Sequence, residues 1–481
     1  MLLRNFFILF FVLIGGCAQN VRPPMNMNMD QSLINCHTAL SELNQLAGQH
    51  TGTLIGEKID HTPWLRSNRL LEHFMDDPEL SDVQTLALLQ RMSSLATEGL
   101  TIESGNLPAA LLQAWQDRYS IEDTNSYITQ CQKALTAASA THLHATKHWL
   151  QQLPKDDDYR ELARIAGIYP LTALAFHLGV RNEHQHIQSL WKKENHREWI
   201  SYIPKPAPSS PTPVKMTDIA MDALGLPQLT PSQQQNLLHL HAPNWLIATD
   251  DESNRPVHPH WQDGQLKTIA QPSSFNYVTL GRFNHQTTIQ LNYMIWFTER
   301  PPLKKLDLLA GEHDAIIFRI HMTIEGDTLA YDNIHLCGCW YSLILSKNQP
   351  VAPEKGPYTE PLMVFRTDFN NPVALYLQPN THLLINVEQF SKTKPEEQRE
   401  YQQITFQQLY QLPAGDSFRS VFDKQGFVTG SERAERWLYW PMGVRNPGAL
   451  RRPGDHAIRF IGKLHFDDPL ILEKLGVGKP L

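Results

Sequence analysis

The sequence predicts an α+β protein with a helical N-terminal domain and a β-rich, mainly antiparallel C-terminal domain. From about residue 30 to residue 200, apolar residues recur every three or four positions, as on the buried faces of amphipathic helices. Proline-rich residues 201–215 interrupt this pattern, and alternating apolar and polar residues typical of strands follow them. The chain of 481 residues exceeds the roughly 250–300 residues at which a single core stops growing. We therefore expect two domains, 30–200 and 216–481, joined by a linker at 201–215.

Several helices are predicted in the N-terminal domain. The apolar spacing within Leu33–Leu43 and within Leu86–Leu95 predicts two of them. A third is expected to begin at Glu122 and Asp123, because acidic side chains in the first turn interact favourably with the helix dipole. Gly179 predicts the end of another helix, since glycine commonly follows the last helical turn.

In the C-terminal domain, the apolar period changes to that of strands. Every second residue of Thr288–Phe297 is apolar, which predicts a strand with one buried face. Gly326 and Asp327 suit a two-residue hairpin turn, which would place His321 opposite Asp332. Further strands are expected at 315–324, 328–340, 362–365, 373–377 and 382–387, and helices at 231–240, 396–412 and 431–440.

The charge and the apolar content limit the class of partner. The net charge is -7, whereas binding to nucleic acid requires a concentrated basic surface. We therefore expect no nucleic-acid partner. No run after residue 17 is long and apolar enough to predict a transmembrane helix.

The first residues carry an export pattern. Arg4 and the amino terminus supply positive charge, Phe6–Ile14 are apolar, and Gly15 and Gly16 precede Cys17. This segment is too short to span a bilayer, and it resembles the signal segment of bacterial lipoproteins. The resemblance implies that residues 1–16 are removed and that Cys17 carries a diacylglycerol and an acyl chain such as palmitate. Two or more lipid chains give stable anchoring.

The resemblance also implies a location. Ala18 after Cys17 is similar to the residue at that place in lipoproteins sorted to the outer membrane. We therefore expect an outer-membrane protein that is tethered by residues 17–29 and has the bacterial membrane as a partner.

The remaining four cysteines form two local groups. Export places thiols where disulfides persist, so Cys36 and Cys131 are expected to pair within the helical domain. The alternative is two buried free thiols. Cys337 and Cys339 form the second group.

His335, Cys337 and Cys339 alternate along one predicted strand and would share a face. Imidazole and thiolate are ligands that zinc and copper prefer, and a histidine beside a cysteine can also activate a thiol nucleophile. Gly338 and Cys339 resemble the Gly-Cys pair of L,D-transpeptidases, although Leu336 stands where that family has serine and Tyr341 where it has arginine. The alternative is a core face, and no cofactor is predicted in that case.

The predicted contact between His321 and Asp332 has two interpretations. The pair could act as an acid–base couple, or it could be an ordinary exposed contact between neighbouring strands.

A basic and aromatic cluster occurs near the C-terminus. Aromatic rings present flat faces to sugars, and guanidinium groups match phosphate and carboxylate geometry. The candidate ligand-binding residues are Arg436, Trp437, Trp440, Arg445, Arg451 and Arg452. Alternatively, these arginines pair with Asp455, Asp467 and Asp468 in a turn-rich region.

Two function classes follow from these observations. The first is a binding or structural envelope lipoprotein that recognises an anionic glycan or a lipid headgroup. The second is an envelope hydrolase or transferase with a histidine and cysteine centre.

Overall fold

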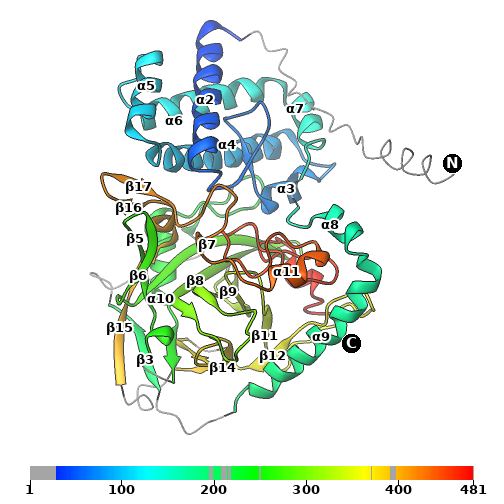
Figure 1. The fold of residues 1–481 in the computed structure, drawn as a ribbon. Coiled ribbons are helices and arrows are strands. Elements are labelled where there is room, and N and C mark those ends of the chain that lie inside the picture. Colours follow the sequence, from blue (N-terminus) through cyan, green and yellow to red (C-terminus); the bar gives the residue numbers. More distant parts are fainter. Residues whose placement is uncertain are drawn as a thin grey trace, which may run out of the picture.

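Helices and strands are segregated along the chain in the computed structural model, which confirms the α+β class. The structure describes residues 29–155, 157–193, 199–206, 214, 218–248, 251–369, 371–390 and 397–479. The helices are α2 (Gln31–His50), α3 (Arg69–Met75), α4 (Asp82–Gly105), α5 (Ala109–Tyr119), α6 (Thr124–Ser139), α7 (Leu143–Leu150), α8 (Glu161–Ala166), α9 (Tyr169–Leu190), α10 (Pro231–Leu240), α11 (Arg436–Tyr439) and α12 (Ile471–Lys474). Helices α2 to α7 form a layer above a body built mainly of strands (Figure 1).

The helical layer has its own core, in which α2, α4 and α6 pack together. Leu40, Met92 and Leu135 are fully buried there. A disulfide joins Cys36 of α2 to Cys131 of α6 with a Cα–Cα distance of 5.2 Å, which confirms the predicted pairing. The layer is thus closed by apolar packing and by one covalent link.

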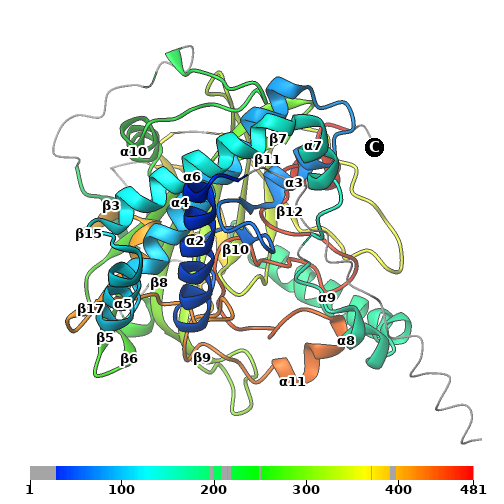
Figure 2. The same cartoon turned by 90° about the horizontal axis from the view of Figure 1, so that it is seen from above.

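Strands make up most of the body beneath the helical layer. They are β1 (Glu57–Lys58), β2 (Arg66–Ser67), β3 (Ile200–Pro204), β4 (Asn244–Ile247), β5 (His258–Gln262), β6 (Gln265–Ile269), β7 (Ser273–Phe283), β8 (Gln286–Arg300), β9 (Gly311–Thr323), β10 (Thr328–His335), β11 (Ser342–Ser346), β12 (Val364–Thr367), β13 (Val373–Leu377), β14 (Leu384–Gln389), β15 (Glu397–Thr405), β16 (Leu412–Ala414) and β17 (Ser417–Arg419). Within the described residues, the largest sheet has eleven strands in the order β12-β11-β10-β9-β8-β7-β15-β3-β4-β13-β14. Seen from above, α2, α4 and α6 lie over this body (Figure 2).

The central strand β8 is buried on both faces. Leu291 and Tyr293 pack into the core that α10 covers, as the predicted alternation requires. Met294 and Trp296 on the opposite face pack into a second core, which includes side chains of the C-terminal loops. Gln290 and Asn292 lie on this second face, nearer the helical layer, where they are also buried.

Four predicted elements differ from the structure. Of the helix predicted at 431–440, only Arg436–Tyr439 is α-helical. Gly179 does not end a helix, because α9 continues through it from Tyr169 to Leu190. Residues 397–405 form strand β15 instead of a helix, since they gain parallel backbone pairing with β3 and β7. The strand predicted at 328–340 ends at His335, and a turn with Gly338 at φ +92° follows.

The hairpin register also differs from the prediction. The turn between β9 and β10 is longer than the predicted two residues, since Thr328 pairs with Met322 instead of Glu325, and an irregularity between Thr328 and Ala330 then shifts the pairing by one residue. As a result, Arg319 pairs with Asp332, and His321 pairs with Ala330. The two-residue shift leaves every side chain on its predicted face.

The segment predicted as a linker begins inside the sheet. Residues 201–204 belong to β3, which pairs with both β4 and β15. Residues 207–213 and 215–217 lie outside the described residues, as do residues 1–28 with the predicted signal segment, Cys17 and most of the tether. In the described part of the chain, no helix has the length and apolar character needed to cross a membrane.

Candidate functional site

A cavity of about 450 Å³ lies between the helical layer and the sheet. Its floor comes from β7, β8 and β9, one wall from α3 and α4, and the other wall from the C-terminal loops. The polar and aromatic side chains that line it include Arg69, Glu72, Arg91, Glu98, Tyr277, Thr279, Gln290, Asn292, Arg319, Phe406, Tyr410, Arg452, His456, Phe466 and Asp467. A second hollow of about 760 Å³ lies near His50 and β16–β17. We take the first as the candidate site because a connected network of buried polar groups forms its floor.

The floor is organised around the buried carboxylate of Asp332. Arg319 donates from Nε to Oδ1 over 2.9 Å, and the hydroxyl of Tyr341 donates to Oδ2 over 3.0 Å. Nε2 of His321 lies 3.0 Å from Oδ2. Burial alone would raise the pKa of Asp332, but Arg319 and His321 outweigh it and hold the pKa well below its usual range. Asp332 is therefore a permanent anion that fixes the Arg319 side chain at the cavity floor.

A chain of hydrogen bonds connects His321 to the cavity. Nδ1 of His321 lies 3.4 Å from Nε2 of Gln290, and Oε1 of Gln290 accepts from the Thr279 hydroxyl over 2.8 Å. Asn292 in turn donates to Thr279 over 2.9 Å. Burial lowers the pKa of His321, and Asp332 only partly offsets this effect. The predicted contact of His321 with Asp332 thus exists, but it is buried beneath the cavity instead of exposed on the sheet.

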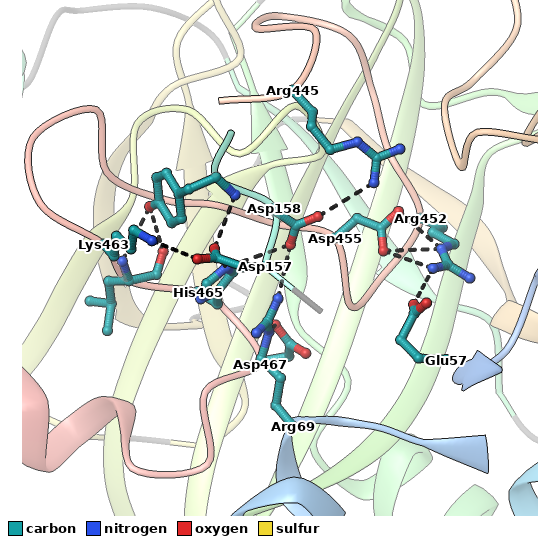
Figure 3. A network of polar contacts seen from close by, with 12 residues as sticks. Glu57, Arg69, Asp157, Asp158, Arg445, Arg452, Asp455, Lys463, His465 and Asp467 are labelled. Carbon is teal, nitrogen blue, oxygen red and sulfur yellow. Dashed lines mark hydrogen bonds and ion pairs between the residues drawn. The ribbon is translucent and has the colours of Figure 1, made fainter. Parts of the chain in front are cut away.

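One wall of the cavity is held by ion pairs around Arg69 (Figure 3). Arg69 of α3 donates to Asp158 over 3.0 Å and to Asp467 over 3.1 Å. Arg445 lies 3.7 Å from the other carboxylate oxygen of Asp158. Through these contacts, α3 of the helical layer is joined to the C-terminal loops that carry Arg445 and Asp467.

Two of these carboxyl groups have unusual proton affinities. Burial, reinforced by the nearby Asp455, raises the pKa of Asp158 to about 7, although Arg69 opposes the shift. Burial raises the pKa of Asp467 to about 6, again against Arg69. Asp467 lines the cavity, so the charge of this wall changes as the pH falls through about 6.

A second group of contacts crosses between the layers at Arg452. Its Nε donates to both oxygens of Asp455 over 3.1 and 3.0 Å, and its Nη1 donates to the carbonyl of Thr53 over 2.6 Å. Its Nη2 also donates to Glu57 of β1. Arg452 is the one predicted ligand-binding residue that lines the cavity.

The other predicted ligand-binding residues are dispersed. Arg451 is buried and donates to the carbonyls of Arg445 and Asn446. Trp437 and Trp440 are exposed on or next to α11. Arg436 is half-buried and lies over the Trp437 ring at 5.1 Å from its centroid, and Arg445 is also half-buried. The sequence cluster therefore does not form one surface, because Arg451 and Arg452 are buried in the fold while Trp437 and Trp440 are exposed.

The predicted histidine and cysteine group lies in the protein core. His335 is fully buried, and its Nδ1 lies 3.5 Å from Asp314. Cys337 is buried in the large apolar core, and Cys339 packs against that core. Among the residues that the structure describes, no three His, Cys, Asp or Glu side chains are grouped to hold a metal ion. The buried apolar surroundings of His335, Cys337 and Cys339 support the interpretation that these side chains belong to the core.

We expect the Cys337 and Cys339 thiols to be unreactive in the native protein. A hydrogen bond with Cys337, together with burial, raises the pKa of Cys339 well above its ordinary value, so little thiolate forms. Cys337→Ala should cost about 1–2 kcal/mol through the cavity that it leaves. Thiol titration before and after unfolding, with a urea melt of the variant, tests this. Rapid alkylation of the native protein, or zinc lost on substitution, would contradict it.

Comparisons with known proteins give no relative from which to assign this site. No protein-family model, curated protein or solved structure matches the chain. The cavity was also not predicted from the sequence, because its lining residues come from segments that are far apart in the chain. The sequence did contain one signal for the cavity floor, because Thr288, Gln290 and Asn292 place polar side chains on one face of the predicted strand, and Gln290 and Asn292 line the cavity.

Proposed function

We propose that this protein is an outer-membrane lipoprotein that binds an anionic glycan of the cell envelope in the cavity between its layers. The observation that carries the proposal is the lining of that cavity. Four guanidinium groups, from Arg69, Arg91, Arg319 and Arg452, line it beside amide and aromatic side chains, together with the carboxyl groups of Glu57, Glu72, Glu98 and Asp467. Guanidinium groups bind carboxylates in a fixed geometry, and aromatic rings offer flat apolar faces.

The charged groups of the lining favour a sugar over a lipid tail, although Leu54, Leu95, Leu226 and Leu280 also line the cavity. Arg319, Arg91 and Arg69 are each held by a carboxylate, with Arg91 donating to Asp222 over 2.7 Å. Such pairing fixes the donors in place without leaving a large net positive charge. An acyl chain would require an apolar cavity, because buried polar groups without partners are costly.

Binding of soluble muropeptides, which are anionic glycan fragments, tests the cavity assignment. We expect Tyr277→Leu and Arg91→Gln each to weaken binding about tenfold, which corresponds to about 1.4 kcal/mol. Tyr358→Leu should have no effect, because Tyr358 is exposed and does not line the cavity. Titration calorimetry on the purified chain measures these affinities.

Two outcomes would contradict the glycan assignment. One is a wild-type chain that does not bind muropeptides. The other is tighter binding of glycerophosphoglycerol, a lipid headgroup without sugar, which would assign the cavity to headgroups instead.

The lipid anchor has a separate test. Cys17→Ser should move most of the protein from the membrane pellet to the soluble fraction of cells, because the thioether bond to diacylglycerol requires the Cys17 sulfur and a surface contact with lipid alone is reversible. Its melting temperature should equal that of the wild-type chain without its signal segment. A Ser variant that stays in the membrane pellet as completely as the wild type after repeated washing would show that Cys17 is not the anchor.

A further inference from the structure

An apolar face on α8 and α9 is exposed to solvent. Its side chains recur every three or four residues and are between 44% and 68% exposed, namely Leu162, Ile165, Ile168, Leu171, Leu174 and Leu178. The opposite side of these helices is fixed to the body, since buried Arg164 donates to the carbonyls of Met442 and Gly462. The exposed residues therefore cannot turn inward to join the core.

Two further apolar segments adjoin this face. On α11 and just after it, Trp437, Leu438 and Trp440 are exposed, and Trp437 is 75% exposed. The ring of Tyr439 in α11 packs edge-on against Phe176 of α9, with a centroid distance of 5.2 Å. Figures 1 and 2 both show α11 beside α8.

The loop between β8 and β9 is the second of these segments. Leu303, Leu306 and Leu308 are exposed in it, and Leu308 accepts a backbone hydrogen bond from Glu435 next to α11. The contacts of α11 with α9 and with this loop bring the three sets of exposed apolar residues near one another, and exposed apolar groups that gather in this way mark interaction sites.

The charges around the apolar residues indicate what covers them. Lys304 and Lys305 are exposed and stand between Leu303 and Leu306. Tryptophan, leucine and lysine side by side suit the boundary between anionic headgroups and acyl chains, where the rings and aliphatic groups are buried and the ammonium groups stay in water.

We propose that the surface formed by α8, α9, α11 and loop 303–308 lies on the phospholipid leaflet that holds the lipid anchor. This proposal rests on the anchor at Cys17. Met29 lies twelve residues after Cys17, and a segment of that length spans at most about 43 Å when extended. The anchor therefore keeps the protein close to the membrane without fixing which face meets it. Once the anchor holds the chain at the membrane, the local lipid concentration at the apolar surface is high, so even a weak contact between that surface and the leaflet is formed most of the time.

Membrane contact through this surface would also orient the cavity. Contact through α8, α9 and α11 would fix the orientation of the body on the membrane, and with it the direction in which the space between the layers opens. A bound glycan would then meet the protein at a constant place relative to the bilayer.

Flotation with lipid vesicles tests the surface. The probe is the mature chain carrying Cys17→Ser, mixed with vesicles of phosphatidylethanolamine and phosphatidylglycerol. We expect this unlipidated chain to float, and Leu171→Gln with Leu178→Gln to lower its vesicle affinity about tenfold or more, because two apolar side chains no longer enter the bilayer. Lys304→Glu with Lys305→Glu should weaken binding only when phosphatidylglycerol is present.

Matched control variants change equally exposed apolar residues elsewhere. Val83→Gln on α4 and Phe418→Gln on β17 should leave flotation unchanged, since both side chains are exposed, α4 belongs to the helical layer, and β17 lies across the body from α8 and α11 (Figures 1 and 2). All variants should keep the wild-type melting temperature, because none of the changed side chains is buried.

Three results would overturn the proposal. The Cys17→Ser chain fails to float, or the two glutamine substitutions leave flotation unchanged. The third is a dimer in sedimentation that these substitutions dissociate, which would assign the face to a second copy of the chain. Vesicle binding by the unlipidated chain does not depend on the anchor, and muropeptide affinity is measured separately. A failure here is therefore distinguishable from a failure of the proposed function.

Discussion

Replacing Asp332 by alanine should destabilise the protein by about 3–5 kcal/mol, the cost of breaking a buried ion pair. Asp332 and Arg319 are both almost completely buried. Without the carboxylate, the guanidinium of Arg319 would stay buried without its counter-ion, and His321 and Tyr341 would each lose a hydrogen-bond partner. Few single substitutions in the chain should cost more, since most cost near 1 kcal/mol.

Urea denaturation measures this effect as a lower midpoint at an unchanged slope. Asp327→Ala is the control, because Asp327 is an exposed residue of the hairpin turn. The double variant Arg319→Met with Asp332→Leu should be more stable than Asp332→Ala alone, since it removes both charges together. A loss below about 1 kcal/mol in Asp332→Ala would show that the pair does not contribute to the stability of the fold.

Local signals were sufficient to predict several elements. Asp123 begins α6, where its side chain accepts from the backbone of Asn125 and Ser126. Pro231 opens α10, after Thr230 in a capping box. In both cases the residues that decide the structure are adjacent in sequence, so no distant contact was needed.

Other elements depend on distant contacts and could not be predicted. Residues 397–405 form a strand because β3 and β7 offer backbone partners on both sides. Helix α9 tolerates Gly179 because neighbouring residues such as Ala173 and Ile187 are packed against the body. Tertiary contacts override the local preference of glycine in such cases.

The candidate site was missed for the same physical reason. The turn is longer than predicted, and together with the one-residue irregularity near Thr328 it displaces the register by two residues, which places Arg319 instead of His321 directly opposite Asp332. The remaining walls come from α3, α4 and the C-terminal loops. No spacing rule connects Arg69 to Asp467, which lie 398 positions apart.

Removing the disulfide should have the second large effect on stability. Cys36 and Cys131 are 95 residues apart, and closing a loop of that length reduces the entropy of the unfolded chain by an equivalent of about 4–5 kcal/mol. The double variant Cys36→Ala with Cys131→Ala should therefore unfold at a much lower temperature than the wild type. Peptide mapping under non-reducing conditions should show the two cysteines joined.

Reduction separates the covalent contribution from the packing contribution. Cys131 is buried in the helical core, so alanine also leaves a small cavity there, whereas a reduced wild-type chain keeps both sulfur atoms in place. Wild-type protein in dithiothreitol should consequently melt slightly above the double variant and far below the oxidised protein. If dithiothreitol leaves the melting temperature unchanged, or if both cysteines are alkylated before reduction, the two helices are held together by apolar packing alone.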